Sequence, residues 1–176
     1  MAYASQVHGD TVLWTSTEGC AGEADALLTR ESGLLVAVRT ADCVPILIRG
    51  EGVVGAVHAG WRGLASGIIL KACQMLQDEG PLEAVVGPAI CGACYEGGDE
   101  VVDAIAAWTD RSLFVIEGPR KAHIDPGAAA AAQLRSAGVS EVTRLSICTH
   151  CDARLWSHRQ EGSRAGRQAG LVGRRC

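Results

Sequence analysis

The middle of the chain contains three short apolar runs, at residues 34–38, 44–48 and 53–57, in which β-branched residues are frequent. Apolar runs of this length are typical of strands that are buried on both faces of a sheet. Polar and turn-forming residues separate the runs, so each predicts a separate strand. We therefore expect these segments to form the centre of a sheet.

Helical patterns follow these strands. Residues 64–77 predict a helix that the Gly80-Pro81 breaker ends, and the alanine-rich residues 126–135 predict another, closed by Gly138. The other predicted elements are a helix at 99–108 and short strands at 84–86, 113–116 and 142–147. Because strands and helices interleave, we expect an α/β (or α+β) fold: a single layered domain over residues 1–176, with a mixed β-sheet and flanking helices.

Composition narrows the class of protein. Of 176 residues, 48% are hydrophobic and 20% are charged, as in a globular domain with a core. The net charge of -4 argues against nucleic acid as a partner, and no apolar run reaches the ~20 residues of a membrane-spanning helix. The first residues have no signal-peptide pattern, so we expect a cytoplasmic protein whose eight cysteines are thiols, metal ligands or nucleophiles.

Residues capable of chemistry lie at the ends of the apolar elements. His8 precedes a strand-like segment, Cys43 lies between two predicted strands, and His58 directly follows the third. Two imidazoles and a thiolate are good zinc ligands, and three protein ligands with one open position are usual for catalytic zinc. The numbers of residues between these three candidates are not those of a zinc finger. From spacing alone, a capping histidine, a core cysteine and an unrelated loop histidine remain the alternative.

Charged residues adjoin these candidates. Arg62 follows His58 in a glycine-flanked turn that leads into a helix, and both a helix N-terminus and a guanidinium favour a phosphate or carboxylate. Asp42 precedes Cys43 and is either a general base, a carboxylate that orients a histidine ligand, or a solvated turn residue.

The remaining informative cysteines form two CxxC pairs, Cys91/Cys94 and Cys148/Cys151. A zinc ion at the second pair would need further ligands such as His150 or His158; the alternative places this pair near the mouth of the pocket. The first pair either lines the site or packs in the interior.

Seven segments carry a resemblance over nearly the whole chain. They are QVHGD (6–10), EADALLT (23–29), TADCVPILI (40–48), VGAVHAGWRGLASGI (54–68), VGPAICGACYEGGDEV (86–101), HIDPGAAAAAQLRSAGV (123–139) and CTHCDARLWSHRQEGSRAGRQAGLV (148–172). In this order they resemble the YfiH/LACC1 family (DUF152), whose members also go by the name multicopper polyphenol oxidases. A lone HAGWR would be a weak signal, but seven ordered matches are highly specific.

The resemblance implies that His8, Cys43 and His58 bind zinc. It also implies a layered mixed α/β fold, shared distantly with cytotoxic necrotising factor deamidases. The implied activities are phosphorolysis of adenosine, inosine, guanosine and methylthioadenosine, and deamination of adenosine. In deamination, zinc would lower the pKa of a bound water that attacks the purine. We expect a monomer or homodimer in which Cys43, His58, Asp42 and Arg62 are catalytic.

Four residues are candidates for binding substrate. Arg62 is the first candidate for phosphate and Arg159 the second. Gln6 is either a substrate contact or a surface residue. His123 is a candidate pocket residue, and it precedes Asp125, which we expect to cap the following helix.

The chain departs from the family pattern at several points. It begins almost at QVHGD, where family members carry a further strand-rich stretch, so we expect a truncated or a naturally short member. Gly97 replaces a usual valine. Family tails often read SYRR and TGR, where this chain has Ser157-His158-Arg159-Gln160 and Ala165-Gly166-Arg167. None of these changes affects the proposed ligands.

Three other functions compete with the zinc enzyme. Cys43 as a nucleophile with His58 as its base would give a cysteine hydrolase or deamidase, including an editing enzyme for peptidoglycan precursors. A copper polyphenol oxidase (laccase) fits less well, because multicopper sites need more histidines than the five present. A metal-sensing or partner-binding domain would use the zinc only for structure.

Overall fold

The structure, a computed structural model, describes residues 1–118 and 121–175. In these residues the strands are β1 (Ala2–Ser5), β2 (Val12–Trp14), β3 (Gly19–Glu23), β4 (Ala26–Thr29), β5 (Leu35–Thr40), β6 (Val44–Gly50), β7 (Val53–Ala59), β8 (Glu83–Val86), β9 (Glu96–Gly97), β10 (Val115–Ile116), β11 (Ala122–Ile124), β12 (Glu141–Arg144) and β13 (Gln168–Gly173). The helices are α1 (Trp61–Ser66), α2 (Ile68–Met75), α3 (Asp99–Ala106), α4 (Pro126–Ser136) and α5 (His158–Glu161), and η1 (Gly92–Cys94), η2 (Arg111–Leu113) and η3 (Gly162–Arg164) are short 3-10 turns.

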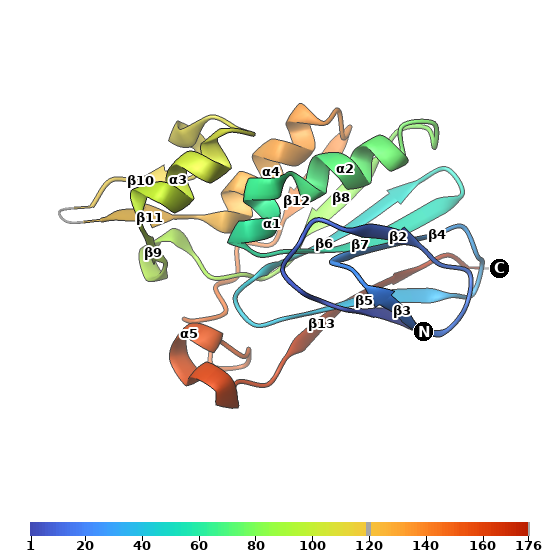
Figure 1. The fold of residues 1–176 in the computed structure, drawn as a ribbon, viewed down its shortest axis with the longest axis horizontal. Helices are drawn as coiled ribbons and strands as arrows, with labels where there is room; N and C mark the ends of the chain where they lie inside the picture. The colour runs from blue at the N-terminus through green and yellow to red at the C-terminus, as the bar shows by residue number, and fades with distance from the viewer. Residues whose placement is uncertain (119–120, 176) are drawn as a thin grey trace.

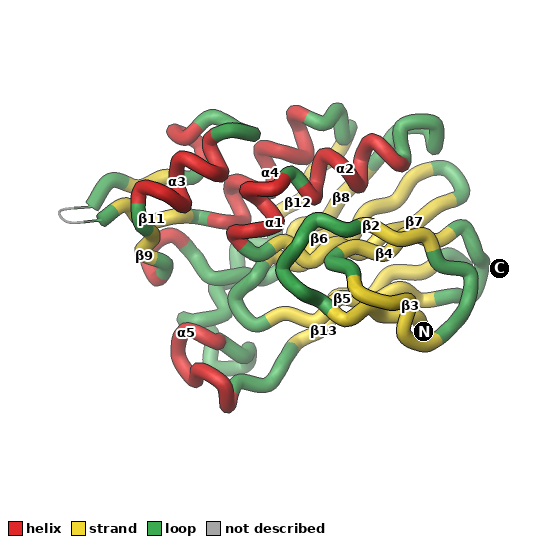
Figure 2. The backbone as a smooth tube through the Cα atoms, viewed as in Figure 1, coloured by secondary structure: helices red, strands yellow, loops and turns green. Residues whose placement is uncertain are grey.

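Two sheets and a layer of helices are stacked on one another (Figure 1). The central sheet has the strand order β12-β8-β6-β7-β4-β2, and the second sheet has the order β13-β5-β1-β3. Helices α1, α2 and α4 cover the face of the central sheet opposite the second sheet (Figure 2). Both sheets contain parallel and antiparallel pairs. The predicted α/β class, with a mixed sheet and flanking helices, is confirmed.

Strand β7 explains why the middle of the chain is so apolar. Every residue of β7 is buried. Val53 and Val57 belong to the core shared with the helices, whereas Val54 and Ala56 belong to the core between the two sheets. A strand between two layers needs apolar side chains on both faces. The three predicted runs therefore correspond to β5, β6 and β7.

The structure differs from the predicted helix at residues 64–77, which is two helices broken at Gly67. The φ of Gly67 is 78°, a left-handed conformation that glycine adopts without steric penalty. A Cβ on Gly67 would also lie only 3.1 Å from the Trp108 ring. The Trp108 indole N–H donates to the Ala65 carbonyl over 2.6 Å, which satisfies an acceptor at the break.

Two predicted strands are shorter in the structure. The strand predicted at residues 142–147 ends at Arg144, and the one predicted at 113–116 contains only β10, preceded by the turn η2. Strands β10, β11 and β9 form a small third sheet beside α3 (Figure 1).

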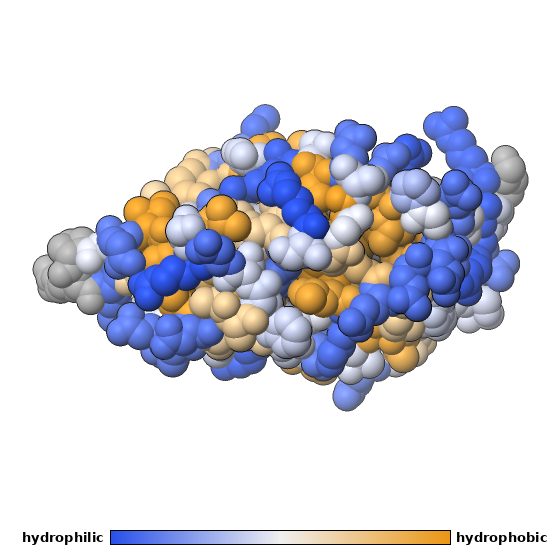
Figure 3. All heavy atoms as spheres, turned by 90° about the horizontal axis from the view of Figure 1, so that it is seen from above, coloured by the Kyte–Doolittle hydropathy of each residue, from blue (hydrophilic) through white to orange (hydrophobic). Residues whose placement is uncertain are grey.

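The surface over the helices mixes hydrophobic and charged side chains (Figure 3). The exposed hydrophobic residues of the described chain include Met75 at the end of α2 and Trp108 after α3. None of the helices in the described residues is long and apolar enough to span a membrane.

Candidate active site

The three predicted ligands meet at one end of the central sheet. His58 lies in β7 opposite Pro45 of β6, Cys43 directly precedes β6, and His8 lies in the loop after β1. One ligand atom of each lies within 4.8 Å of those of the other two. The His8 and His58 rings are 4.9 Å apart, with an interplanar angle of 81°. The fold thus brings together three residues that are distant in sequence.

A buried carboxylate, Asp25, supports this trio. His58 Nδ1 donates to Asp25 Oδ1 over 2.8 Å, which leaves Nε2 as the nitrogen available to a metal ion. The backbone N–H groups of Val7, His8 and Gly9 also donate to the carboxylate. Burial opposes its ionisation, but the hydrogen bonds from His58 and Gly9 lower the pKa of Asp25. Asp25 therefore orients one histidine through its ring and the other through its backbone, whose φ is 60°.

The trio stabilises a thiolate. Burial opposes ionisation of the Cys43 thiol, but hydrogen bonds from His58 and His8 lower its pKa to about 7. Burial likewise disfavours the His58 imidazolium, whereas hydrogen bonds with Asp25 and Cys43 raise its pKa to about 9. The thiolate is the form of cysteine that binds metals or acts as a nucleophile.

The donor set and the space around it fit a metal ion. Gly60 follows β7, and a Cβ there would lie 3.1 Å from Cys43 Sγ and 3.2 Å from the His8 ring. Two imidazoles and a thiolate, with a carboxylate behind one imidazole, match a three-ligand zinc site with its supporting hydrogen bond. The residues present can therefore hold a metal ion that keeps one position open.

A cavity of about 700 Å³ opens in front of the trio. This volume is within the range of small-molecule binding sites. Four cations line the cavity: Arg39, Arg62, Arg159 and Arg167. Asp42 is the one acidic side chain among the described residues that line it. The charge of the cavity therefore favours an anionic ligand.

Two aromatic side chains share the wall with these arginines. The Arg159 guanidinium lies 5.3 Å from the centre of the Tyr95 ring, and the Arg62 guanidinium lies 4.4 Å from that of Trp61. Both distances are within the range of cation–π attraction. The cavity thus presents flat aromatic surfaces next to positive charge.

Asp42 connects segments of the cavity wall through hydrogen bonds, and its side chain is buried rather than solvated. Thr149 Oγ1 donates to Asp42 Oδ1 over 2.7 Å, and the Arg159 backbone N–H donates to Oδ2 over 2.6 Å. The Ile90 N–H donates to the Asp42 carbonyl over 3.0 Å. Asp42 has a φ of 83°, so its backbone turns sharply between β5 and Cys43. These contacts make Asp42 an anchor for the segment that carries Arg159.

The other predicted residues have contacts within the protein. Gln6 lines the cavity, but its amide pairs with the backbone N–H and carbonyl of Arg39, each at 2.8 Å. His123 lies in β11, where Nδ1 donates to the Gly92 carbonyl over 2.8 Å, and it is not among the described residues that line the cavity. Asp125 accepts a backbone N–H of α4, which confirms its prediction as the N-cap.

Sequence reasoning missed Asp25, Tyr95 and two of the arginines. The signal for Asp25 was its position directly before β4, all of whose residues are buried. Arg39 and Arg167 carried no signal, because a single exposed arginine is common on any surface.

Fold and site define a class: mixed α/β proteins with a His-Cys-His ligand set beside an arginine-lined cavity. The chain belongs to the family described as multi-copper polyphenol oxidoreductase laccase, whose family model matches residues 1–175. Solved structures similar to this chain include a YfiH protein and a DUF152 protein. The resemblance drawn from the sequence is therefore confirmed.

Relatives with named activities are similar over most of the chain. A purine nucleoside phosphorylase of Aquifex aeolicus is 41% identical over 141 residues, which cover 79% of this chain and 66% of the relative. Adenosine deaminase RL5, from an unknown prokaryotic organism, is 38% identical over 155 residues, or 81% of this chain and 59% of the relative. The chain thus spans less than two thirds of the length of these two proteins.

Similar solved structures carry the same fold. YlmD from Geobacillus stearothermophilus is 33% identical, with a TM-score of 0.90 over 97% of this chain and 72% of that one. YfiH from Bacillus licheniformis is 26% identical, with a TM-score of 0.91 over 99% of this chain and 74% of that one.

Proposed function

We propose that the chain is a zinc-dependent purine nucleoside enzyme. Its reactions would be phosphorolysis of adenosine, inosine, guanosine and methylthioadenosine, and deamination of adenosine. The observation that carries this proposal is the cavity, in which an open His-Cys-His set faces four arginines. The names of the Aquifex aeolicus and RL5 relatives support the same substrate class.

Zinc is the metal that we assign to His8, Cys43 and His58. The same donors occur in blue-copper sites, but those add a weak axial methionine or, in its place, a glutamine or backbone oxygen, and the Gln6 amide is already paired with the Arg39 backbone. Neither Met1 nor Met75 is among the described residues that line the cavity. A zinc ion bound here would act as a Lewis acid at its open position.

Other residues of the cavity would bind the substrates or position the residues that bind them. Arg62 and Arg159 would bind the phosphate, because guanidinium groups match phosphate oxygens in charge and geometry. The ring of Tyr95 offers a flat surface on which a purine can stack. Asp42 would act as a positioning residue for Arg159, and Gln6 for the strand that carries Arg39. We assign this activity to residues 1–176 as one catalytic domain.

Product analysis tests the proposal. Zinc-loaded protein is incubated with adenosine, with and without inorganic phosphate, and the products are separated by chromatography. Phosphate-dependent adenine or phosphate-independent inosine is expected, and both should vanish in Cys43→Ala. If zinc-loaded protein of verified metal content converts none of the four nucleosides, the proposal is wrong.

Substitution of Arg62, with Arg164 as a control, tests the proposed phosphate site. Arg62→Ala should raise the KM for phosphate about tenfold or more, because a charge-assisted contact contributes ~1.5–3 kcal/mol. Arg164→Ala is the matched control, since Arg164 is exposed and outside the cavity lining. Equal KM values for the two variants would remove Arg62 from the phosphate site.

A cysteine hydrolase is the second candidate, because the pKa of Cys43 is lowered to about 7 beside His58. Metal dependence separates the two functions. A hydrolase would be inhibited by thiol alkylation and would work without zinc, whereas the proposed enzyme loses its activity when zinc is removed and regains it when zinc is returned.

A further inference from the structure

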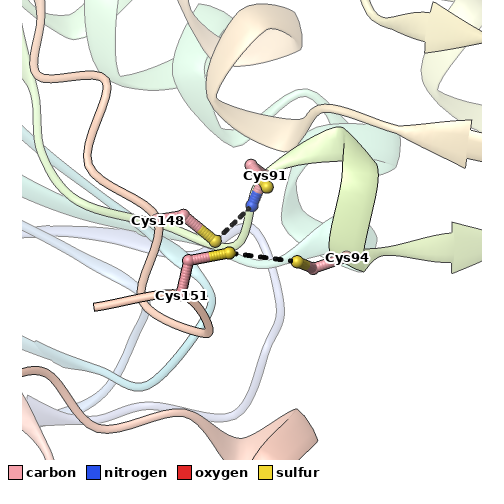
Figure 4. A group of neighbouring side chains, drawn as sticks. All are labelled: Cys91, Cys94, Cys148 and Cys151. Carbon is pink, nitrogen blue, oxygen red and sulfur yellow. Dashed lines mark hydrogen bonds between the residues drawn. The ribbon is translucent and has the colours of Figure 1, made fainter. Parts of the chain in front are cut away.

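A second group of ligands lies outside the cavity. Cys91 and Cys94 come from the loop after β8, and Cys148 and Cys151 come from the loop after β12 (Figure 4). The four sulfur atoms all lie within 4.8 Å of one another. All four side chains are free thiols. The two CxxC pairs, each incomplete as a metal site, therefore complete each other.

The spacing of the sulfur atoms suits tetrahedral coordination. With Zn–S bonds of about 2.3 Å, the sulfur atoms of a tetrahedral site are about 3.8 Å apart. Cys94 Sγ and Cys151 Sγ are 3.4 Å apart, and the full set lies within 4.8 Å. Shifts of about 1 Å or less in the side chains would place all four at the zinc distance.

Backbone groups support the cluster as they do in metal–thiolate sites. The Cys91 N–H donates to Cys148 Sγ over 3.3 Å. Such donors offset the excess negative charge of four thiolates around one divalent cation. Ala89 forms a β-bridge with Cys148, and its carbonyl accepts the Thr149 N–H over 3.1 Å. The two loops are therefore already held side by side.

We propose that Cys91, Cys94, Cys148 and Cys151 bind a structural zinc ion in a closed, four-thiolate site behind the wall of the cavity. Binding releases the thiol protons to solvent, forms four Zn–S bonds and involves no redox step. His150 and His158, which the sequence offered only as examples of the further ligands that a zinc ion at the second pair would need, are not part of this ligand set.

The position of the cluster explains what such a zinc ion would do. Cys94 directly precedes Tyr95, and Cys91 follows Ile90, and both of these neighbours line the cavity. Thr149, next to Cys148, binds the Asp42 carboxylate that also anchors Arg159. The zinc ion would join the loop that carries Tyr95 to the segment that leads to Arg159, and so fix the substrate-binding wall.

Metal analysis in a Cys43→Ser background tests the proposal, because that substitution removes a ligand of the first site. The purified protein should retain about one zinc per chain. Cys151→Ser in this background should lose it, since Cys151 is a ligand, whereas the control Cys20→Ser should keep it. Both positions are exposed, so neither substitution disturbs the core.

Spectroscopy identifies the atoms bound to the zinc ion without substituting any of the four cysteines. X-ray absorption at the zinc edge of the Cys43→Ser protein should give a sulfur-only shell at about 2.3 Å. Cobalt titration should give the charge-transfer and visible bands of a tetrahedral thiolate complex. The proposal is wrong if the protein holds no zinc, if the shell contains nitrogen, if Cys151→Ser keeps the metal, or if the cluster cysteines are joined by disulfides instead.

Discussion

The two ligand clusters of this protein differ in what surrounds the metal position. His8, Cys43 and His58 supply three donors and face a cavity of about 700 Å³. The four-cysteine cluster supplies a full set of donors and is outside the described lining of that cavity. Three protein donors would leave a bound metal ion with an open coordination position, whereas four would leave it with none.

The supporting hydrogen bonds differ in the same way. A buried carboxylate, Asp25, stands behind the first site, where it fixes the ring orientation of His58. A backbone N–H, that of Cys91, supports the second. Asp42 connects the two regions, because it adjoins Cys43 in sequence and accepts hydrogen bonds from Thr149 and Arg159.

The largest expected contrast is in metal removal. Brief treatment with a chelator should abolish adenosine conversion while about one zinc per chain remains, because the open position lets a competing ligand attack the first site. Metal content and activity are measured on the same samples over time. Parallel loss of both metal equivalents with activity would contradict the distinction between an open and a closed site.

Removing the carboxylate behind the open site should strongly destabilise the protein. Asp25→Ala leaves His58 and three backbone donors without their partner, so we expect the free energy of unfolding to fall by ~3–5 kcal/mol. Urea denaturation measures this change. Asp10→Ala is the control, since Asp10 forms a surface pair with Lys71 and should contribute about 1 kcal/mol or less. Similar losses in both variants would mean that Asp25 is not the anchor.

Substitution of Asp42, which connects the two regions, should reduce stability less than substitution of Asp25. Asp42→Gly removes both acceptors and leaves the Thr149 hydroxyl and the Arg159 backbone N–H without their partner, so stability should fall by ~1–3 kcal/mol. Glycine adopts a positive φ without steric penalty, which keeps the backbone turn. The KM for nucleoside or phosphate should rise more than kcat falls, because Arg159 loses its anchor. Asp152→Gly, in the loop after β12 that carries Thr149, should leave KM unchanged; a fall in kcat alone would argue against a positioning role.

The smallest expected effect concerns the space at the open site. Gly60→Ala adds a methyl group 3.1 Å from Cys43 Sγ, so the ligands must move by a few tenths of an ångström. Zinc affinity should fall by about 1 kcal/mol, at the low end of the range for overpacking. Competition with a zinc indicator measures it. At Gly9 the nearest contact of a Cβ is 3.6 Å, so Gly9→Ala should bind zinc like the wild type.

The sequence predicted the centre of the fold better than its edges. Strand β7 is buried throughout and most residues of β5 and β6 are buried, so these three strands appear as continuous apolar runs. Strands β1 and β3 are short and contain alanine, glycine and polar residues, and they lack such a signal. Likewise, the break at Gly67 depends on a left-handed turn and on Trp108, which is distant in sequence.

The site was harder to predict from the sequence than the core strands, because its residues contact partners that are distant in sequence. The ligand trio followed from the family resemblance, because its separations match no local motif. Asp25 was missed, since a buried carboxylate and a solvated one look alike in sequence. The cysteine cluster was missed because each CxxC pair was considered alone, although two such pairs together supply a complete zinc ligand set.

Anomalous diffraction at the zinc edge from crystals of zinc-loaded protein tests the account most directly. We predict two peaks, one between His8, Cys43 and His58 with its fourth position open to the cavity, and one enclosed by the four cysteines. A single peak, or a fourth protein ligand at the first site, would contradict the distinction between an open reactive site and a closed structural one.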